Sequence, residues 1–113
     1  MDIKTSDHQE IVVFDIAGDL SRPSGVSLHQ AVKAQHERGK RNIVLNFGEV
    51  GFVDSFGVGE ILASYISTQH LGGKIKLCQI SKKLYLVFQV TGLIKILEIF
   101  EDCESALQSF ERL

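Results

Sequence analysis

The 113-residue sequence contains one proline, no tryptophan and two cysteines, and these scarcities narrow what it can encode. Because Pro23 is the only proline, no proline-rich linker divides the chain, and residues 1–113 are expected to form one domain. Cys78 and Cys103 match no metal-ligand spacing. Nothing points to an oxidising compartment, so we expect no disulfide and expect Cys78, within an apolar run, to be a small buried residue.

The chain also lacks a basic block and a long hydrophobic run. Its formal net charge is −2, so the electrostatic footprint of a nucleic-acid-binding protein is absent. No apolar run approaches the ~20 residues of a membrane span, and residues 1–5 do not begin a signal peptide. We therefore expect a cytoplasmic protein that binds no nucleic acid and does not insert into a membrane. At 44% apolar and 23% charged residues, its composition is that of a globular domain.

Hydrophobic patterning predicts alternating strands and helices. Three consecutive apolar residues, Ile43, Val44 and Leu45, are typical of a strand covered on both faces. The order β-β-α-β-α-β-α-β-α predicts an α/β domain with a mixed sheet of four or five strands, about four helices and right-handed crossovers. The expected strands are residues 3–7, 10–17, 42–47, 74–80 and 97–100; the expected helices are residues 26–38, 55–71, 82–90 and 103–113.

Several side chains are assigned to particular positions in these elements. Ser24, Ser81 and Asp102 are expected to cap helices, and residues 18–24 and 48–53 are expected to be loops. The helix after Asp54 has the best apolar periodicity in the chain. We expect its apolar stripe to form one buried face; the stripe consists of Val58, Ile61, Leu62, Tyr65 and Ile66.

An acid and a hydroxyl, Asp54 and Ser55, stand where the strand of residues 42–47 and its loop lead into this helix. Open α/β sheets place sites at such junctions, because strand ends and a helix N-terminus converge there. A nucleophilic serine is not favoured, since Val53 replaces the first glycine of Gly-x-Ser-x-Gly and the histidines are explained as surface residues. Either Asp54 or Ser55 can simply cap the helix.

Two further chemistries are weighed at this junction. The segment Gly57-Val58-Gly59 is followed by no P-loop lysine, so we expect its small residues to let the helix start approach another backbone closely. A metal site at Asp54 would need other acids beside it. Asp15 lies inside its strand, and although Asp19 could approach Asp54 from another loop, no metal is expected.

Residues 43–62 resemble the signature of STAS domains, specifically the bacterial anti-sigma factor antagonists. That signature is an apolar strand, a short loop, an aromatic-apolar-Asp-Ser segment, then Gly-apolar-Gly and an apolar helix. The resemblance covers essentially the whole chain, in order. It continues in residues 18–20, 72–73, 80–81, 90–97 and 106–107.

The resemblance implies a phosphorylation switch. In that family the serine after the aspartate is phosphorylated by an anti-sigma factor that is a serine kinase, and Ser55 holds this position. The unphosphorylated protein binds the anti-sigma factor and frees the sigma factor, and a serine phosphatase restores binding. The resemblance implies a non-enzyme without cofactor, monomeric or weakly dimeric. The implied partner-binding residues are Asp19, Leu20, Ser21, Asp54, Ser55, Phe56, Gly57 and Val58.

Three residues depart from the common family pattern. Phe56 replaces a small residue, while Ser21 and Asn46 each stand where aspartate is frequent. Some scaffold proteins of stressosome-type complexes carry phenylalanine at the position of Phe56, so a scaffold or transporter-associated subunit is the alternative function. A small-ligand-binding STAS domain is a third. Phe56 is expected either to be exposed as an apolar anchor or to fold back onto the domain.

Overall fold

A single mixed sheet organises the molecule. The computed structural model describes residues 1–21 and 27–110, which form five strands, four α-helices and one short 3-10 helix. The strand order is β1-β2-β3-β4-β5, with β1 antiparallel to β2 and the other neighbours parallel. The strands are β1 (Asp2–His8), β2 (Ile11–Leu20), β3 (Asn42–Val53), β4 (Lys74–Cys78) and β5 (Glu98–Phe100); the helices are α1 (Leu28–Glu37), α2 (Ser55–His70), α3 (Lys82–Val90), η1 (Leu93–Lys95) and α4 (Cys103–Ser109).

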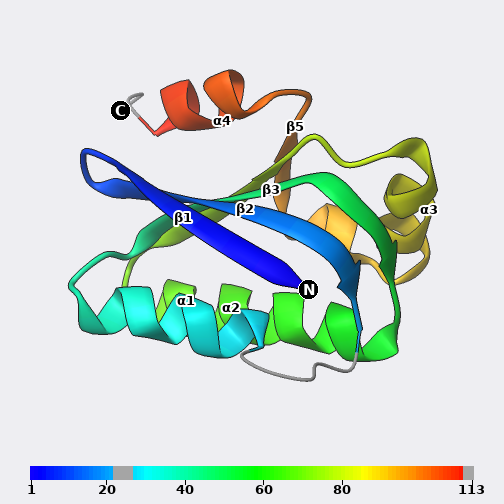
Figure 1. Ribbon diagram of the computed structural model, residues 1–113, viewed down its shortest axis with the longest axis horizontal. Coiled ribbons are helices and arrows are strands. Elements are labelled where there is room, and N and C mark those ends of the chain that lie inside the picture. Colours follow the sequence, from blue (N-terminus) through cyan, green and yellow to red (C-terminus); the bar gives the residue numbers. More distant parts are fainter. Residues whose placement is uncertain (22–26, 111–113) are drawn as a thin grey trace.

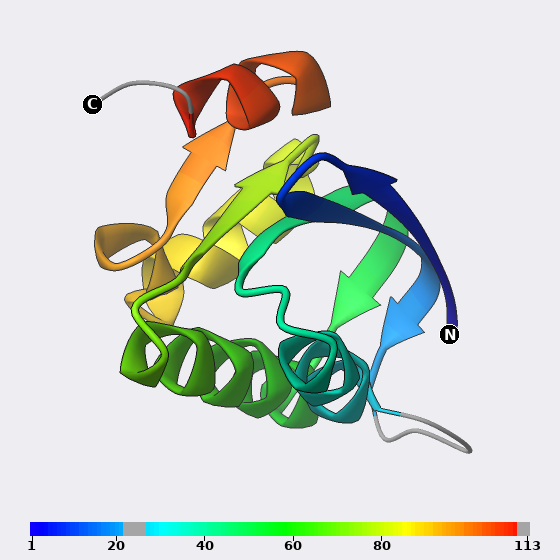
Figure 2. The same ribbon diagram turned by 90° about the vertical axis from the view of Figure 1, so that its left-hand side faces the viewer.

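Helices cover both faces of the sheet, as the continuous apolar strand predicted. Figures 1 and 2 show α1 and α2 side by side beneath one face and α4 alone above the other. Side chains alternate along β3: Ile43, Leu45 and Phe47 enter the core shared with α1, α2 and α3, whereas Val44 enters a smaller cluster beneath α4. We call these the main face and the α4 face.

Two strands are longer than predicted. β2 continues through Leu20 and β3 through Val53, where the sequence analysis placed loops. The two strands remain paired along these extensions, with register shifts near Ala17 and Gly18. Glycines and polar residues in both segments are typical of loops, but cross-strand pairing satisfies the backbone polar groups and keeps the segments extended.

The helix caps follow local sequence, with one correction. Ser81 and Asp102 cap α3 and α4 as predicted, each side chain accepting a hydrogen bond from an amide three residues later. The first helix begins at Leu28, and its cap is Ser27 rather than Ser24, which lies outside the described residues. Ser27 and Gln30 form a reciprocal capping box at this end.

The buried face of α2 agrees with the predicted one only in part, since Ile61 is buried in the main core and Val58 and Tyr65 pack against it. Leu62 and Ile66 are 37% and 47% exposed, whereas Ile61, Ser64 and Thr68 are fully buried. The buried hydroxyls have partners: Ser64 Oγ donates to the Glu60 carbonyl at 2.8 Å, and Thr68 Oγ1 is 3.0 Å from the His36 ring. Small side chains on this face let α2 approach α1 and the sheet closely, so the larger apolar residues face outward.

The two cysteines correct a second prediction. Cys78 at the end of β4 is fully buried, as expected, but it forms a disulfide with Cys103 at the start of α4. Two cysteines 25 residues apart give no pairing signal in the sequence, and only the placement of α4 over β4 brings their Cα atoms to 5.2 Å. α4 ends at Ser109 rather than at residue 113, and residues 111–113 lie outside the described part of the chain.

Candidate functional site

The ends of two parallel strands bring the predicted site residues together. Leu20 at the end of β2 pairs with Val53 at the end of β3, and the next amide, that of Asp54, donates to the Leu20 carbonyl at 3.3 Å. The segment of Asp19 and Ser21 therefore lies directly beside the start of α2. Sequence alone does not show whether Asp19 and Asp54 approach one another; the register of the two neighbouring strands places them in one surface region.

Gly57 allows this close approach. A Cβ atom at Gly57 would lie 2.1 Å from the Leu20 carbonyl oxygen and 2.9 Å from a methyl group of Val53. A Cβ atom at Gly59 would meet no described residue within 4 Å. The prediction that small residues let this helix start approach another backbone is thus confirmed for Gly57, while Gly59 has no such role.

Asp54, not Ser55, caps α2. The Oδ1 atom of Asp54 accepts a hydrogen bond from the Gly57 amide at 2.9 Å, and the Asp54 carbonyl accepts from the Val58 amide, also at 2.9 Å. Ser55 is the first residue of the helix and is exposed. Because Asp54 performs the capping, the hydroxyl of Ser55 stands at the positive end of the helix dipole without a structural role in the cap.

Two phenylalanines flank this hydroxyl in the sequence, and both are exposed. Phe56 is 40% exposed, which decides between the two expectations for it: the ring does not fold back into the core. Phe52, near the end of β3, is 45% exposed and was missed because its segment was assigned to a loop. A period of two does not mark it in the sequence, because Val50 and Val53 both enter the core although they lie three residues apart.

The eight predicted partner-binding residues divide by burial. Asp19, Ser55 and Phe56 are exposed, and Ser21, Asp54 and Val58 are half-buried. Leu20 and Gly57 are buried and can only position their neighbours. We use the name Ser55 surface for the accessible set together with the added phenylalanine: Asp19, Ser21, Phe52, Asp54, Ser55 and Phe56.

The histidines are not all surface residues, contrary to the sequence-based interpretation. His36 contacts Thr68 between α1 and α2, and burial lowers the pKa of its ring, with a smaller lowering from the nearby His29. His29 is half-buried, and within the described chain its Nε2 atom has no hydrogen-bond partner. Neither ring is hydrogen-bonded to Ser55 over residues 1–21 and 27–110; the serine–histidine contact in these ranges joins Ser6 and His8, at 3.2 Å.

The described residues contain neither a cluster of metal ligands nor a membrane-spanning helix. Among residues 1–21 and 27–110, no group of three or more His, Cys, Asp or Glu side chains could hold a metal ion. Asp15, an acid considered above, instead accepts a hydrogen bond from the side-chain amide of Asn46 at 2.7 Å. No helix in the same ranges is long and apolar enough to cross a membrane.

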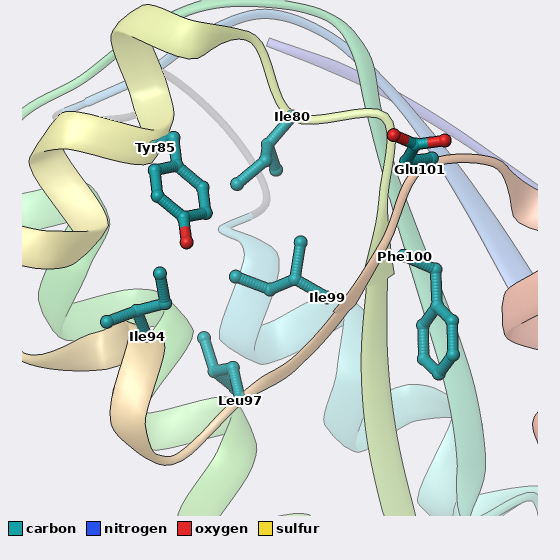
Figure 3. Close-up of a pocket in the computed structure, with 7 residues that line it drawn as sticks. All are labelled: Ile80, Tyr85, Ile94, Leu97, Ile99, Phe100 and Glu101. Atoms are coloured by element: carbon teal, nitrogen blue, oxygen red, sulfur yellow. The ribbon is translucent and has the colours of Figure 1, made fainter.

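A cavity of about 460 Å³ lies between α3, η1 and β5. Figure 3 shows that five of its side chains surround a common hollow: Ile80, Tyr85, Ile94, Leu97 and Ile99. Phe100 and Glu101 complete the lining. The lining includes no residue of the Ser55 surface, and its polar side chains are one phenol and one carboxylate. It is therefore a separate, mainly aliphatic cavity.

Comparison with known proteins identifies the family. The profile of the STAS domain matches residues 2–106, which is nearly the whole chain. The chain belongs to the STAS domain family, in agreement with the resemblance found in its sequence. Its five-stranded mixed sheet, flanked by helices on both faces, is the fold of that family's solved structures.

Several of the similar proteins are named as anti-sigma factor antagonists. The anti-sigma F factor antagonist of Paenibacillus polymyxa is 27% identical over 112 residues, covering 98% of this chain and 96% of that protein. The unphosphorylated anti-sigma factor antagonist SpoIIAA has a TM-score of 0.77 at 21% identity, with 99% and 100% of the two chains covered. The phosphorylated form of Bacillus SpoIIAA has a TM-score of 0.73 at 23% identity, covering 96% and 99%. These names describe regulatory binding proteins rather than enzymes.

Proposed function

We propose that this protein is an anti-sigma factor antagonist whose binding is switched by phosphorylation of Ser55. In the unphosphorylated state the Ser55 surface binds an anti-sigma factor that is also a serine kinase, and the sigma factor is released. Transfer of phosphate to Ser55 ends the binding, and a serine phosphatase restores it. The observation that carries this proposal is an exposed serine at the first position of α2 whose capping role is taken by Asp54.

The position of Ser55 suits a charge switch that leaves the fold intact. A phosphate adds about 1.5–2 negative charges at neutral pH, and a helix N-terminus favours such a charge. Ser55 is exposed, so a phosphate on its hydroxyl displaces no core residue. At an interface with a partner, the same charge adds to those of Asp19 and Asp54. Unfavourable charge placement in an interface costs several kcal/mol of binding free energy. Each loss of about 1.4 kcal/mol weakens the affinity about tenfold.

The exposed phenylalanines supply the apolar part of the proposed interface. Aromatic side chains are enriched among the residues that dominate binding energy. Phe52 and Phe56 are both exposed; Phe56 directly follows Ser55, and Phe52 pairs with Asp19 across the two strands. The comparisons support the same reading, because similar folds are known for SpoIIAA in its unphosphorylated and phosphorylated forms. We infer that a local charge, rather than a rearrangement of the domain, controls binding here as well.

The test uses a charge-bearing variant with a matched control. Ser55→Asp is expected to weaken binding to the anti-sigma factor by about tenfold or more in calorimetry, with a nearly unchanged thermal midpoint. Ser105→Asp adds the same charge to an exposed residue of α4 on the opposite face and is expected to bind like the wild type. Equal affinities of the wild type and Ser55→Asp would refute the switch.

A kinase assay and a size measurement complete the test. Ser55→Ala is expected to bind the partner and to accept no labelled phosphate; labelling of this variant would move the phosphoacceptor elsewhere. Light scattering separates the two functional classes considered from the sequence. A monomer or dimer supports the antagonist, whereas a large homogeneous particle supports the scaffold subunit.

A further inference from the structure

The disulfide between Cys78 and Cys103 connects two elements that little else holds together. It joins the end of β4 to the first residue of α4 across a sequence separation of 25. α4 is the helix that covers the α4 face, and Figures 1 and 2 show it separated from α1 and α2 by the whole sheet. The cystine therefore tethers α4 to the sheet at the N-terminal end of the helix.

The noncovalent contacts of α4 are few. The helix has seven residues, and isolated helices shorter than about 12–15 residues are marginal in water. Ala106 is its one fully buried residue, while Leu107 and Phe110 are half-buried against the small cluster. At its C-terminal end, the buried Lys76 of β4 donates a hydrogen bond to Ser109 at 2.7 Å and lies 4.4 Å from the ring centre of Phe110. Among the described residues, these are the contacts that hold the helix when the tether is absent.

The main core does not depend on α4. The buried residues on the main face and those on the α4 face form two clusters without a shared member. Val13, Val44 and Cys78 are the buried strand residues of the cluster beneath α4. The large buried side chains of β2 and β3, such as Phe14 and Phe47, point to the main face. Loss of α4 would uncover the small cluster and leave the packing around α1, α2 and α3 in place.

The two cysteines of the disulfide differ in burial, which favours attack of a reductant on Cys103. Cys78 is fully buried, whereas Cys103 is half-buried and thus reachable from solvent. A thiolate of a dithiol reductant attacks Cys103 Sγ, forming a mixed disulfide and releasing Cys78 as a thiolate, which takes up a proton. The second thiolate of the reductant then attacks the reductant sulfur that is bonded to Cys103 Sγ. This closes the cyclic disulfide of the reductant and releases Cys103 as a thiolate, which takes up a proton. Two electrons pass from the dithiol, which becomes a cyclic disulfide, to the cystine, which becomes two thiols.

We propose that this cystine is a reversible redox site that controls the docking of α4. Oxidation tethers α4 over the sheet. Reduction by a dithiol releases the helix while the main core and the Ser55 surface keep their structure. The proposal rests on the separation of the two clusters and on the short, weakly held helix, and it is independent of the proposed binding function.

Hydrogen exchange read by mass spectrometry tests the proposal on the full chain, before and after treatment with dithiothreitol. Thiol labelling under denaturing conditions is expected to find no free thiols before treatment and two after it. Peptides of α4 are expected to exchange about tenfold faster or more in the reduced protein, while peptides of β3 and α2 are unchanged. Reoxidation is expected to restore the slow exchange.

Cys103→Ser provides the matched control, since it is expected to show the fast α4 pattern without reductant and no response to it. If this variant fails to fold, titration of the wild type with reductant still gives the answer. Free thiols before treatment, or unchanged exchange in α4, would refute the proposal. Faster exchange throughout the chain would also refute it, because the cystine would then be a staple of the whole domain.

Discussion

The two faces of the sheet are held together in different ways. On the main face, α1, α2 and α3 bury a large set of aliphatic and aromatic side chains, including Phe47 and Phe88, whose rings meet edge to face at 6.1 Å. On the α4 face, one seven-residue helix covers a few small side chains, and a disulfide and the buried Lys76 supplement the packing. The first face is stabilised by many dispersed contacts, the second by a few specific links.

This difference matches the roles we propose for the two faces. The Ser55 surface lies at the end of the main face, where paired strands and a capped helix give the phosphoacceptor a rigid frame. A charge switch needs such a frame, because binding then responds to the added charge alone. The α4 face depends on a bond that a thiol can break, and it is remote in the fold from the helix start that carries Ser55. The two controls can therefore act separately.

The largest expected effect comes from the main core. Phe88→Ala removes a fully buried ring and leaves a cavity between α3 and the sheet, so we expect a loss of about 3–5 kcal/mol in the free energy of unfolding, measured by urea denaturation. A loss below about 1 kcal/mol would mean that the main face is not close-packed at this ring.

A smaller effect is expected at the contact between α2 and β2. Gly57→Ala places a methyl group against the Leu20 carbonyl, so it is expected to lower the free energy of unfolding by about 1–3 kcal/mol. Gly59→Ala is the matched control, because Gly59 lies two residues further along the same helix, α2. It meets no neighbour and is expected to raise the stability by about 0.5–1 kcal/mol. Equal effects of the two substitutions would show that the close approach at Gly57 is unimportant.

The smallest effect is expected on the α4 face. Lys76→Met keeps an unbranched apolar side chain beside Phe110 and loses the hydrogen bond to Ser109. Lys76 Nζ also forms an ion pair with Glu98 Oε1 at 3.5 Å. The Glu98 side chain is 53% exposed and stays hydrated after the loss of the lysine charge, so we expect a change of at most about 1 kcal/mol in the free energy of unfolding. A loss above about 3 kcal/mol would assign the lysine charge a dominant part in holding α4.

The sequence predicted the elements that local pattern controls. The order of strands and helices, the caps at Ser81 and Asp102, and the strand–helix junction at Asp54 and Ser55 follow from periodicity and from side chains that bond to nearby amides. The family resemblance rested on the same residues, and the profile match confirmed it. The role of Ser55 as phosphoacceptor stays a prediction for the experiments above.

Other features depend on neighbours far away in the sequence. The extensions of β2 and β3 look like loops until they pair with each other, and Phe52 is recognised as a surface residue only once β3 is known to reach Val53. The Cys78–Cys103 bond could not be predicted either, because it requires α4 to lie over β4.

The amino-acid sequence by itself determined where side chains alternate, where helices begin and which residues stand at the junction, because these properties arise within a few residues of each other. The tertiary structure alone decided which face of α2 is buried. Apolar residues surround much of that helix, and close approach to α1 and the sheet selected the side with Gly57, Ser64 and Thr68 rather than that with Leu62 and Ile66. The same approach placed Asp54 in the cap and left Ser55 exposed beside it, because the Asp54 amide is held by the Leu20 carbonyl of a distant strand.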